Sequence, residues 1–211
     1  MRYVQVSVAV VAVVLAGCPH RARPQSSMGA FGVVCARGDA SCDDPGTTGA
    51  LPAVVAVGAA LQVIFTGDQV TDSPIRVRAA SPYMAVADGP SLQFTAPGFC
   101  AILARSEAGT VVDLAHVEVR PIQTLALEAP ASLAPGQSAV IVAQPRDASD
   151  QPLAGSLSYA WSSSDPSVVA IDSSARGRSA KVLGVGAGTA IVTTVAGAGR
   201  ASVPITVGEK P

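Results

Sequence analysis

The stretch that decides the fold is Trp161-Ser162-Ser163-Ser164-Asp165-Pro166-Ser167-Val168-Val169-Ala170-Ile171. Asp165-Pro166 is a strong turn former, because proline fixes φ at the second position of a turn. Trp161 comes before this turn, where a central strand of a β-sandwich would place a large side chain between two sheets. The stretch therefore predicts a strand, a tight turn and a second strand, with Trp161 in the core.

Short apolar runs, broken by Gly, Pro, Asp and Ser, extend through the chain from Leu51 onward. In several of them apolar residues occupy every second position, which puts them on one face of a strand. These sets are Leu61, Val63 and Phe65; Leu125 and Leu127; Val140 and Val142; and Val203, Ile205 and Val207. Period two with a break about every ten residues is typical of a β-sandwich, and no run of similar length has a helical period.

The two halves of the chain resemble each other. The segment from Ser81 to Asp88 aligns without a gap with the segment from Asp165 to Asp172, and Val77 stands where Trp161 stands. Other landmarks keep the same order in both halves: Val57-Gly58 with Pro135-Gly136, and Pro97-Gly98 with Ala187-Gly188. A repeat of roughly 80 to 90 residues is one whole small sandwich. The sequence therefore predicts two tandem β-sandwiches, at residues 51–120 and 121–208, joined near Arg120-Pro121-Ile122.

The second half also carries a family resemblance. Three separated segments resemble the bacterial immunoglobulin-like domain, group 2, over about residues 122–208: Pro135-Gly136-Gln137-Ser138, the Trp161–Ile171 stretch, and Gly184-Val185-Gly186-Ala187-Gly188-Thr189-Ala190. The first half matches this pattern more weakly. The resemblance implies immunoglobulin-like sandwiches and a role at the cell envelope in spacing, adhesion, or recognition of proteins or glycans. Such folds carry many functions.

The N-terminal residues indicate export. Met1-Arg2-Tyr3 is a short positive start, and the apolar run from Val4 to Leu15 is too short to span a bilayer comfortably, as in a signal peptide. Leu15-Ala16-Gly17-Cys18 resembles the lipobox of bacterial lipoproteins, which implies a signal peptide at residues 1–17 and lipidation of the Cys18 thiol. An ordinary signal peptide with a chance cysteine, or an uncleaved anchor, is the alternative. With Pro19, and no Asp, directly after Cys18, the sequence resembles lipoproteins that pass to the outer membrane.

Residues 18–50 contain Pro, Gly, Ser, Thr, Asp and Arg with little apolar periodicity, and we expect them to form a flexible tether. Within this segment, Cys35 and Cys42 flank a short loop, and in an oxidising compartment they would close a disulfide. Two free thiols are the alternative, and a metal site is disfavoured because no histidine lies nearby to complete a tetrahedral shell. Cys100, inside an apolar run, is expected to be a buried free thiol.

Composition argues against several classes of function. Charged residues are 14%, aromatic residues are 4% and the net charge is −1, so no basic surface for nucleic acid or anionic lipid is expected. The only histidines are His20, in the tether, and His116, which should point to solvent between apolar neighbours, so no catalytic histidine is expected. Four aspartates near predicted turns could converge on calcium or simply form those turns: Asp147, Asp150, Asp165 and Asp172. We predict no enzyme activity, no cofactor and no metal.

Together, these features predict an exported lipoprotein that is anchored in a membrane, with the outer membrane or cell surface as its location. It would display two immunoglobulin-like modules for adhesion, spacing, or interaction with an envelope protein or glycan, and would bind no nucleic acid. A ligand-binding accessory subunit of an envelope complex is the alternative. That alternative predicts an exposed apolar or aromatic patch, for which Tyr83 is a candidate.

Overall fold

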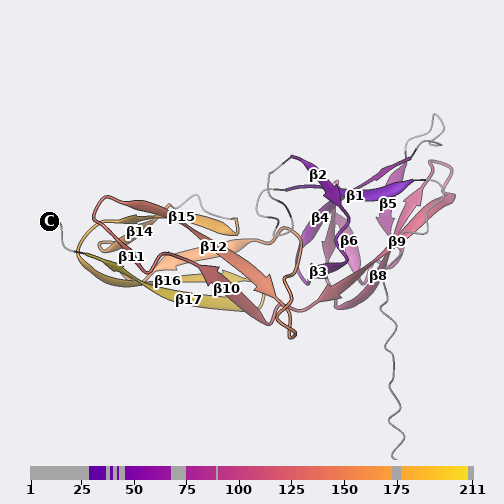
Figure 1. Cartoon of the computed structure of the whole chain (residues 1–211). Helices are drawn as coiled ribbons and strands as arrows, with labels where there is room; N and C mark the ends of the chain where they lie inside the picture. Colours follow the sequence, from indigo (N-terminus) through magenta and orange to yellow (C-terminus); the bar gives the residue numbers. More distant parts are fainter. Residues whose placement is uncertain are drawn as a thin grey trace, which may run out of the picture.

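The computed structural model describes residues 29–36, 39, 42, 46–67, 75–88, 90–172 and 177–208. Every helix or strand assigned among them is a β-strand, so the predicted all-β fold class is confirmed. Within these ranges no helix has the length and hydropathy needed to cross a membrane. The strands form two β-sandwiches that follow one another along the chain (Figure 1). Cys18, His20 and the expected signal peptide lie outside the described residues.

The C-terminal sandwich consists of two four-stranded sheets, with the orders β10-β12-β15-β14 and β11-β17-β16-β13. With the strands lettered A to G along the chain, and A divided between both sheets, this is the A-B-E-D and A′-G-F-C arrangement of an immunoglobulin domain. The strand bounds are Thr124–Glu128 (β10), Ser132–Leu133 (β11), Ser138–Arg146 (β12), Tyr159–Ser163 (β13), Val169–Ile171 (β14), Ser179–Gly184 (β15), Gly188–Ala196 (β16) and Gly199–Val207 (β17).

The N-terminal sandwich repeats this topology. Its sheets have the orders β2-β1-β4-β7-β6 and β3-β9-β8-β5, so every strand except β2 has a counterpart in the C-terminal sandwich. The strand bounds are Ala30–Val34 (β1), Thr48–Ala50 (β2), Val54–Ala56 (β3), Ala60–Thr66 (β4), Arg76–Ala79 (β5), Ala85–Asp88 (β6), Ser91–Phe94 (β7), Gly98–Arg105 (β8) and Val111–Arg120 (β9). The chain is therefore a tandem repeat of one immunoglobulin-like sandwich.

The structure corrects the expected start of the first sandwich. β1 lies inside the segment 18–50 that we expect to be a flexible tether, yet it pairs with β4 along its whole length. Phe31 packs edge-on against Phe65, with ring centroids 5.0 Å apart, and Val33 is buried in the core. The repeat thus begins at Ala30. The five residues of β1 are all small or apolar, and so short a run shows no alternation from which periodicity could predict a strand.

The aligned landmarks form the same backbone structures, which confirms the predicted repeat. Before β6, two successive N–H groups donate to the carbonyl oxygen of Ser81, and before β14 two donate to that of Asp165. β8 and β16 then begin at Gly98 and Gly188, whose φ angles are +127° and +145°. Only glycine adopts such angles without strain, so these positions mark the same bend in both sandwiches.

One strand has the opposite register from the expected one. The sequence pattern predicts Val140 and Val142 on the inner face of β12, but the structure buries Ile141 and Ala143, and Val140 is 60% exposed. Because five consecutive residues of this strand, Ala139 to Ala143, are apolar, alternation cannot choose between its faces. Pairing with β10 and β15 makes the choice, and a shift by one residue reverses every side chain.

Trp161 contributes less to the core than expected. It is half-buried on β13, packs against both buried clusters, and donates its Nε1–H to the carbonyl oxygen of Gly177 at 3.0 Å. Tyr159 is the fully enclosed aromatic residue of this strand, and burial raises the pKa of its hydroxyl to about 12. The indole N–H requires a partner, so Trp161 lies at the rim where it finds one.

Candidate functional site

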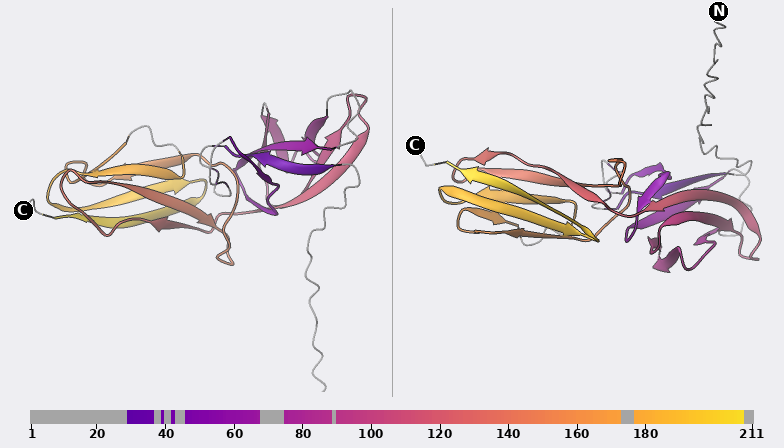
Figure 2. Two further views of the ribbon diagram at one scale, coloured as in Figure 1. Left: turned by 45° about the horizontal axis from the view of Figure 1, so that its top comes forward. Right: turned by 90° about the horizontal axis from the view of Figure 1, so that it is seen from below.

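The two sandwiches meet through the connection between β12 and β13. Residues 152–157 of this connection run along the near end of the N-terminal sandwich (Figure 2). The N–H of Ala56 donates to the carbonyl oxygen of Ala154 at 3.0 Å, and Ala60 and Ser156 exchange two hydrogen bonds of 2.9 Å. The second sandwich therefore supplies a short segment that pairs with strands of the first.

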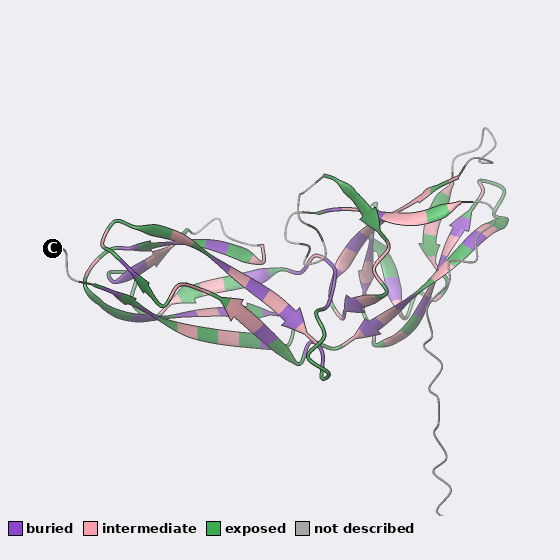
Figure 3. Cartoon of the chain, viewed as in Figure 1, coloured by how far each residue is buried: buried purple, intermediate pink, exposed green. Residues whose placement is uncertain are grey.

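Apolar side chains seal this junction. Leu153 and Leu157, on the connection, are buried in the same cluster as the core of the N-terminal sandwich. Ile122, just after β9, belongs to that cluster as well. Figure 3 shows buried residues on the connection where it passes the N-terminal sandwich. Continuous packing and shared main-chain hydrogen bonds make the junction a docked contact rather than a hinge.

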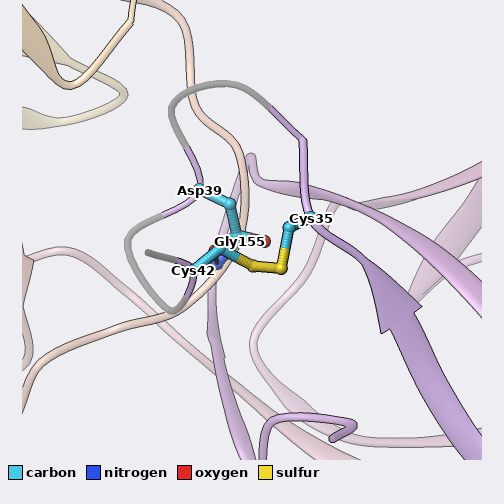
Figure 4. Close-up of a disulfide and its surroundings, with 4 residues drawn as sticks. All are labelled: Cys35, Asp39, Cys42 and Gly155. Carbon is cyan, nitrogen blue, oxygen red and sulfur yellow. Dashed lines mark hydrogen bonds between the residues drawn. A yellow bond between two sulfur atoms is a disulfide. The ribbon is translucent and has the colours of Figure 1, made fainter. Parts of the chain in front are cut away.

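A disulfide lies at the edge of this junction (Figure 4). The structure pairs Cys35 with Cys42, with their Cα atoms 5.6 Å apart. The loop between them carries Asp39, which is only 2% exposed, and its Oδ1 accepts the N–H of Gly155 at 3.0 Å. The disulfide loop thus contacts the second sandwich. This contact and strand β1 together contradict the flexible tether for this part of the chain.

An ion-pair network supports the junction from the end of β9. Arg120 donates to Glu118 at 2.7 Å and to the carboxylate of Asp147, which follows β12. The other oxygen of Asp147 accepts the N–H groups of Ser149 and Gln151 at 2.8 and 2.9 Å. The Arg120 guanidinium and these amides lower the pKa of Asp147, and both acidic partners raise the pKa of Arg120. Both carboxylate oxygens of Asp147 therefore accept hydrogen bonds from within the protein.

The aspartates considered for calcium do not converge. Asp147 follows β12 at the end next to the first sandwich, whereas Asp165 follows β13 at the opposite end. Asp165 accepts hydrogen bonds from the hydroxyl and the N–H of Ser167, and these lower its pKa, as in an ordinary turn. Within the described ranges, no three His, Cys, Asp or Glu side chains gather closely enough to hold a metal ion.

The remaining residues with reactive side chains are placed as expected from the sequence. His116 is exposed on the outer face of β9. Cys100 is buried on β8 as a free thiol, and burial raises its pKa. A high thiol pKa and a closed position make Cys100 a poor nucleophile. Neither residue is part of a catalytic arrangement among the described residues.

The structure also brings together three arginines that sequence reasoning missed. Arg76 lies directly opposite Arg105 in the β5–β8 pair, and Arg78 follows two residues later on the same face of β5. They line a surface hollow of about 290 Å³ together with Ser106, Glu107 and Gly109. The alternation of Arg76 and Arg78 with apolar residues is a visible signal in the sequence, but the contribution of Arg105 depends on strand pairing.

No protein-family model matches the chain, and no curated protein matches it in sequence. Among solved structures, domains 4 and 5 of the S-layer protein SbsC are similar at 18% identity and a TM-score of 0.37, over 84% of this chain and 95% of that fragment. For a longer SbsC fragment, domains 4–9, the matched part is 29% of its length.

Two adhesins show a similar distant likeness. FdeC of Escherichia coli matches at 17% identity and a TM-score of 0.34, over 75% of this chain and 62% of the other. InvE of Yersinia pseudotuberculosis matches at 13% identity and a TM-score of 0.34, over 74% of this chain and 56% of the other. Similarities at this level carry no argument about partners or activity. The immunoglobulin-like assignment therefore rests on this chain's own strand order, and the group 2 resemblance stays a prediction.

Proposed function

We propose that this chain is an exported lipoprotein that displays two docked immunoglobulin-like modules at the cell envelope, where they space or hold a protein or glycan partner. Its anchor would be the acylated Cys18, in the outer membrane or at the cell surface. The N-terminal signal and lipobox pattern support export and acylation, and the tandem sandwiches support display. The proposal includes no enzymatic step.

The observation that carries the display function is the docked junction. Main-chain hydrogen bonds at Ala56 and Ala60, the buried Leu153 and Leu157, and the ion pairs of Arg120 all join the sandwiches. Two modules on a loose linker would need none of these contacts. A fixed pair holds its outer end at a set distance and orientation from the anchored end, which is the property that spacing or presentation requires.

The anchor can be tested with the full-length chain in bacterial cells grown with an alkyne-tagged fatty acid. We expect the wild-type chain to be labelled and to fractionate with membrane, and the Cys18→Ser variant to lose the label. Cys100→Ser, which removes a buried thiol elsewhere, is the matched control and should keep the label. Labelling of Cys18→Ser would overturn the lipobox interpretation.

The display function is tested separately by crosslinking in intact cells. A photo-crosslinker on the exposed face of β16 should trap a discrete envelope component with the wild-type chain. The same crosslinker in a variant with an opened junction, Gly155→Ala, should trap less of it. If no crosslinked species forms at any outward position of either sandwich, the interaction role is wrong.

One observation favours the second candidate function, an accessory subunit that binds a ligand through an aromatic patch. Tyr83 is 85% exposed and Phe99 is 74% exposed, both on the N-terminal sandwich. Contiguous exposed apolar surface marks contact sites, so this role requires the two rings to act together as one patch. Replacing both with serine should abolish capture of an envelope complex if this role holds, and should leave capture unchanged under pure spacing.

A further inference from the structure

The three arginines of β5 and β8, which we call the arginine face, form an unbalanced group of charges: Arg76, Arg78 and Arg105. Like charges directly opposite on neighbouring strands destabilise a sheet, and Arg76 and Arg105 are such a pair. Of these three arginines, only Arg76 has an acidic partner among the described residues: Glu107 lies 3.9 Å away, and more than half of the Arg76 and Glu107 side chains is exposed. Among the described residues that line its hollow, three arginines and one glutamate carry a net charge of +2.

The shape of the arginine face suits a phosphate group. Its hollow of about 290 Å³ is open to solvent and is lined by the three arginines, Ser106 and Gly109, with Glu107 as the one acidic side chain among the described lining residues. A guanidinium presents several N–H donors in a planar fork that matches phosphate oxygens, and pairs of this kind are stronger than neutral hydrogen bonds. The cost of placing Arg76 opposite Arg105 is removed when an anion lies between them.

The arginine face lies at the same end of the N-terminal sandwich as Gly29, the first described residue. A Cβ at Gly29 would lie 2.4 Å from the ring of Phe65, and Phe65 lines a second hollow together with Arg76 and Arg78. The first described residue and the arginine face therefore share one end of the N-terminal sandwich. This end lies away from the junction, because β8 ends and β9 begins there.

We infer that the arginine face docks on the phosphates of anionic lipid headgroups in the membrane that holds the anchor. This inference rests on the proposed lipidation of Cys18. Ten residues separate Cys18 from Gly29, which makes eleven Cα–Cα steps, so the chain between them spans at most about 40 Å. An anchored chain would hold the arginine face near the headgroups, and the second sandwich would then point outward. The net charge of −1 for the whole chain hides this local concentration.

The expected strength of membrane binding follows from the charge of the arginine face. Each arginine near an anionic surface raises partitioning about fivefold, so two arginines contribute about 25-fold. The attraction acts within about 8 Å of the surface at physiological salt and should weaken as salt rises.

The test uses the chain from residue 18 with Cys18→Ser, which keeps every described residue and carries no lipid. Its binding is measured by sedimentation with vesicles of phosphatidylcholine alone or mixed with phosphatidylglycerol. We expect binding to the mixed vesicles only. The double variant Arg78→Gln/Arg105→Gln should bind about 25-fold more weakly. Lys181→Gln/Arg200→Gln, an equal charge change on the second sandwich, should bind like the parent chain.

Three results would overturn the inference. The first is equal binding to both kinds of vesicle. The second is an equal loss in both double variants, which would mean that only net charge matters. The third is binding of soluble polyphosphate through the arginines without binding to mixed vesicles, which would assign the face to a soluble polyanion. Because this chain carries no lipid, the result is independent of the fatty-acid labelling that tests the anchor.

Discussion

Replacing Gly155 by alanine should open the junction between the sandwiches. Gly155 lies in the connection that docks on the N-terminal sandwich, with φ at +100°. An added Cβ would lie 2.6 Å from the Cβ of Ala59 and 3.2 Å from Cγ1 of Val55, both fully buried. The left-handed conformation costs a non-glycine residue about 1–2 kcal/mol. Overpacking a filled core costs about 1–3 kcal/mol more, so we expect a total loss of about 2–5 kcal/mol.

Urea unfolding measures this loss. Trp161 is the only tryptophan, so its fluorescence reports the second sandwich, whereas far-ultraviolet circular dichroism reports both. In the wild-type chain the two signals should change together, and in Gly155→Ala they should separate. Gly136→Ala is the matched control, because Gly136 has φ at +83° with nothing within 4 Å of the added Cβ. If Gly155→Ala loses no more stability than Gly136→Ala, the docked junction does not couple the sandwiches.

Three further outcomes are expected. Thr194→Val should raise the free energy of unfolding by about 1 kcal/mol, measured by urea titration, because the Thr194 hydroxyl is buried without a hydrogen-bond partner among the residues that the structure describes; a loss would contradict this. Because Arg120 lowers the pKa of Asp147, this carboxylate stabilises the fold above its unfolded pKa of about 3.9, and the contribution disappears as pH falls through the lower native pKa. The melting temperature of the wild type should therefore exceed that of Asp147→Asn near neutral pH and approach it in acid, and a constant difference would count against the pair. Replacing Cys35 and Cys42 with serine should speed hydrogen exchange at the junction amides while lowering global stability by less than about 3 kcal/mol, since the closed loop is short; unchanged exchange would show that the disulfide does not hold the contact.

The features that could be predicted from the sequence are those that depend on local backbone chemistry. The turn at Asp165 needs its proline and aspartate, and the bend at Gly188 needs a residue without a Cβ. The same turn and the same glycine bend occur at Ser81 and Gly98, so the repeat can be predicted without knowing which strands pair. Alternation in β4 and β17 then indicated the inner faces correctly.

The features that could not be predicted depend on partners far away in the sequence. β1 becomes a strand only because β4 offers it an edge, and the register of β12 is set by β10 and β15. Asp39 and Gly155 are 116 positions apart, and no local pattern relates them. The arginine face likewise requires the pairing of β5 with β8. Pairwise placement of this kind is invisible to periodicity, which describes one segment at a time.

The hydrogen bonds that residues 152–157 make to the N-terminal sandwich bear on how such chains can be recombined. A fragment that stops at Arg120 would keep all the strands of the first sandwich but would lose the segment that covers β3, an edge strand. Uncovered edges recruit other strands, so that fragment would be prone to self-association. A gene that exchanged one sandwich for another would have to exchange the matching connection with it. The pair of sandwiches, and not the single domain, is therefore the unit that can be inherited or grafted intact.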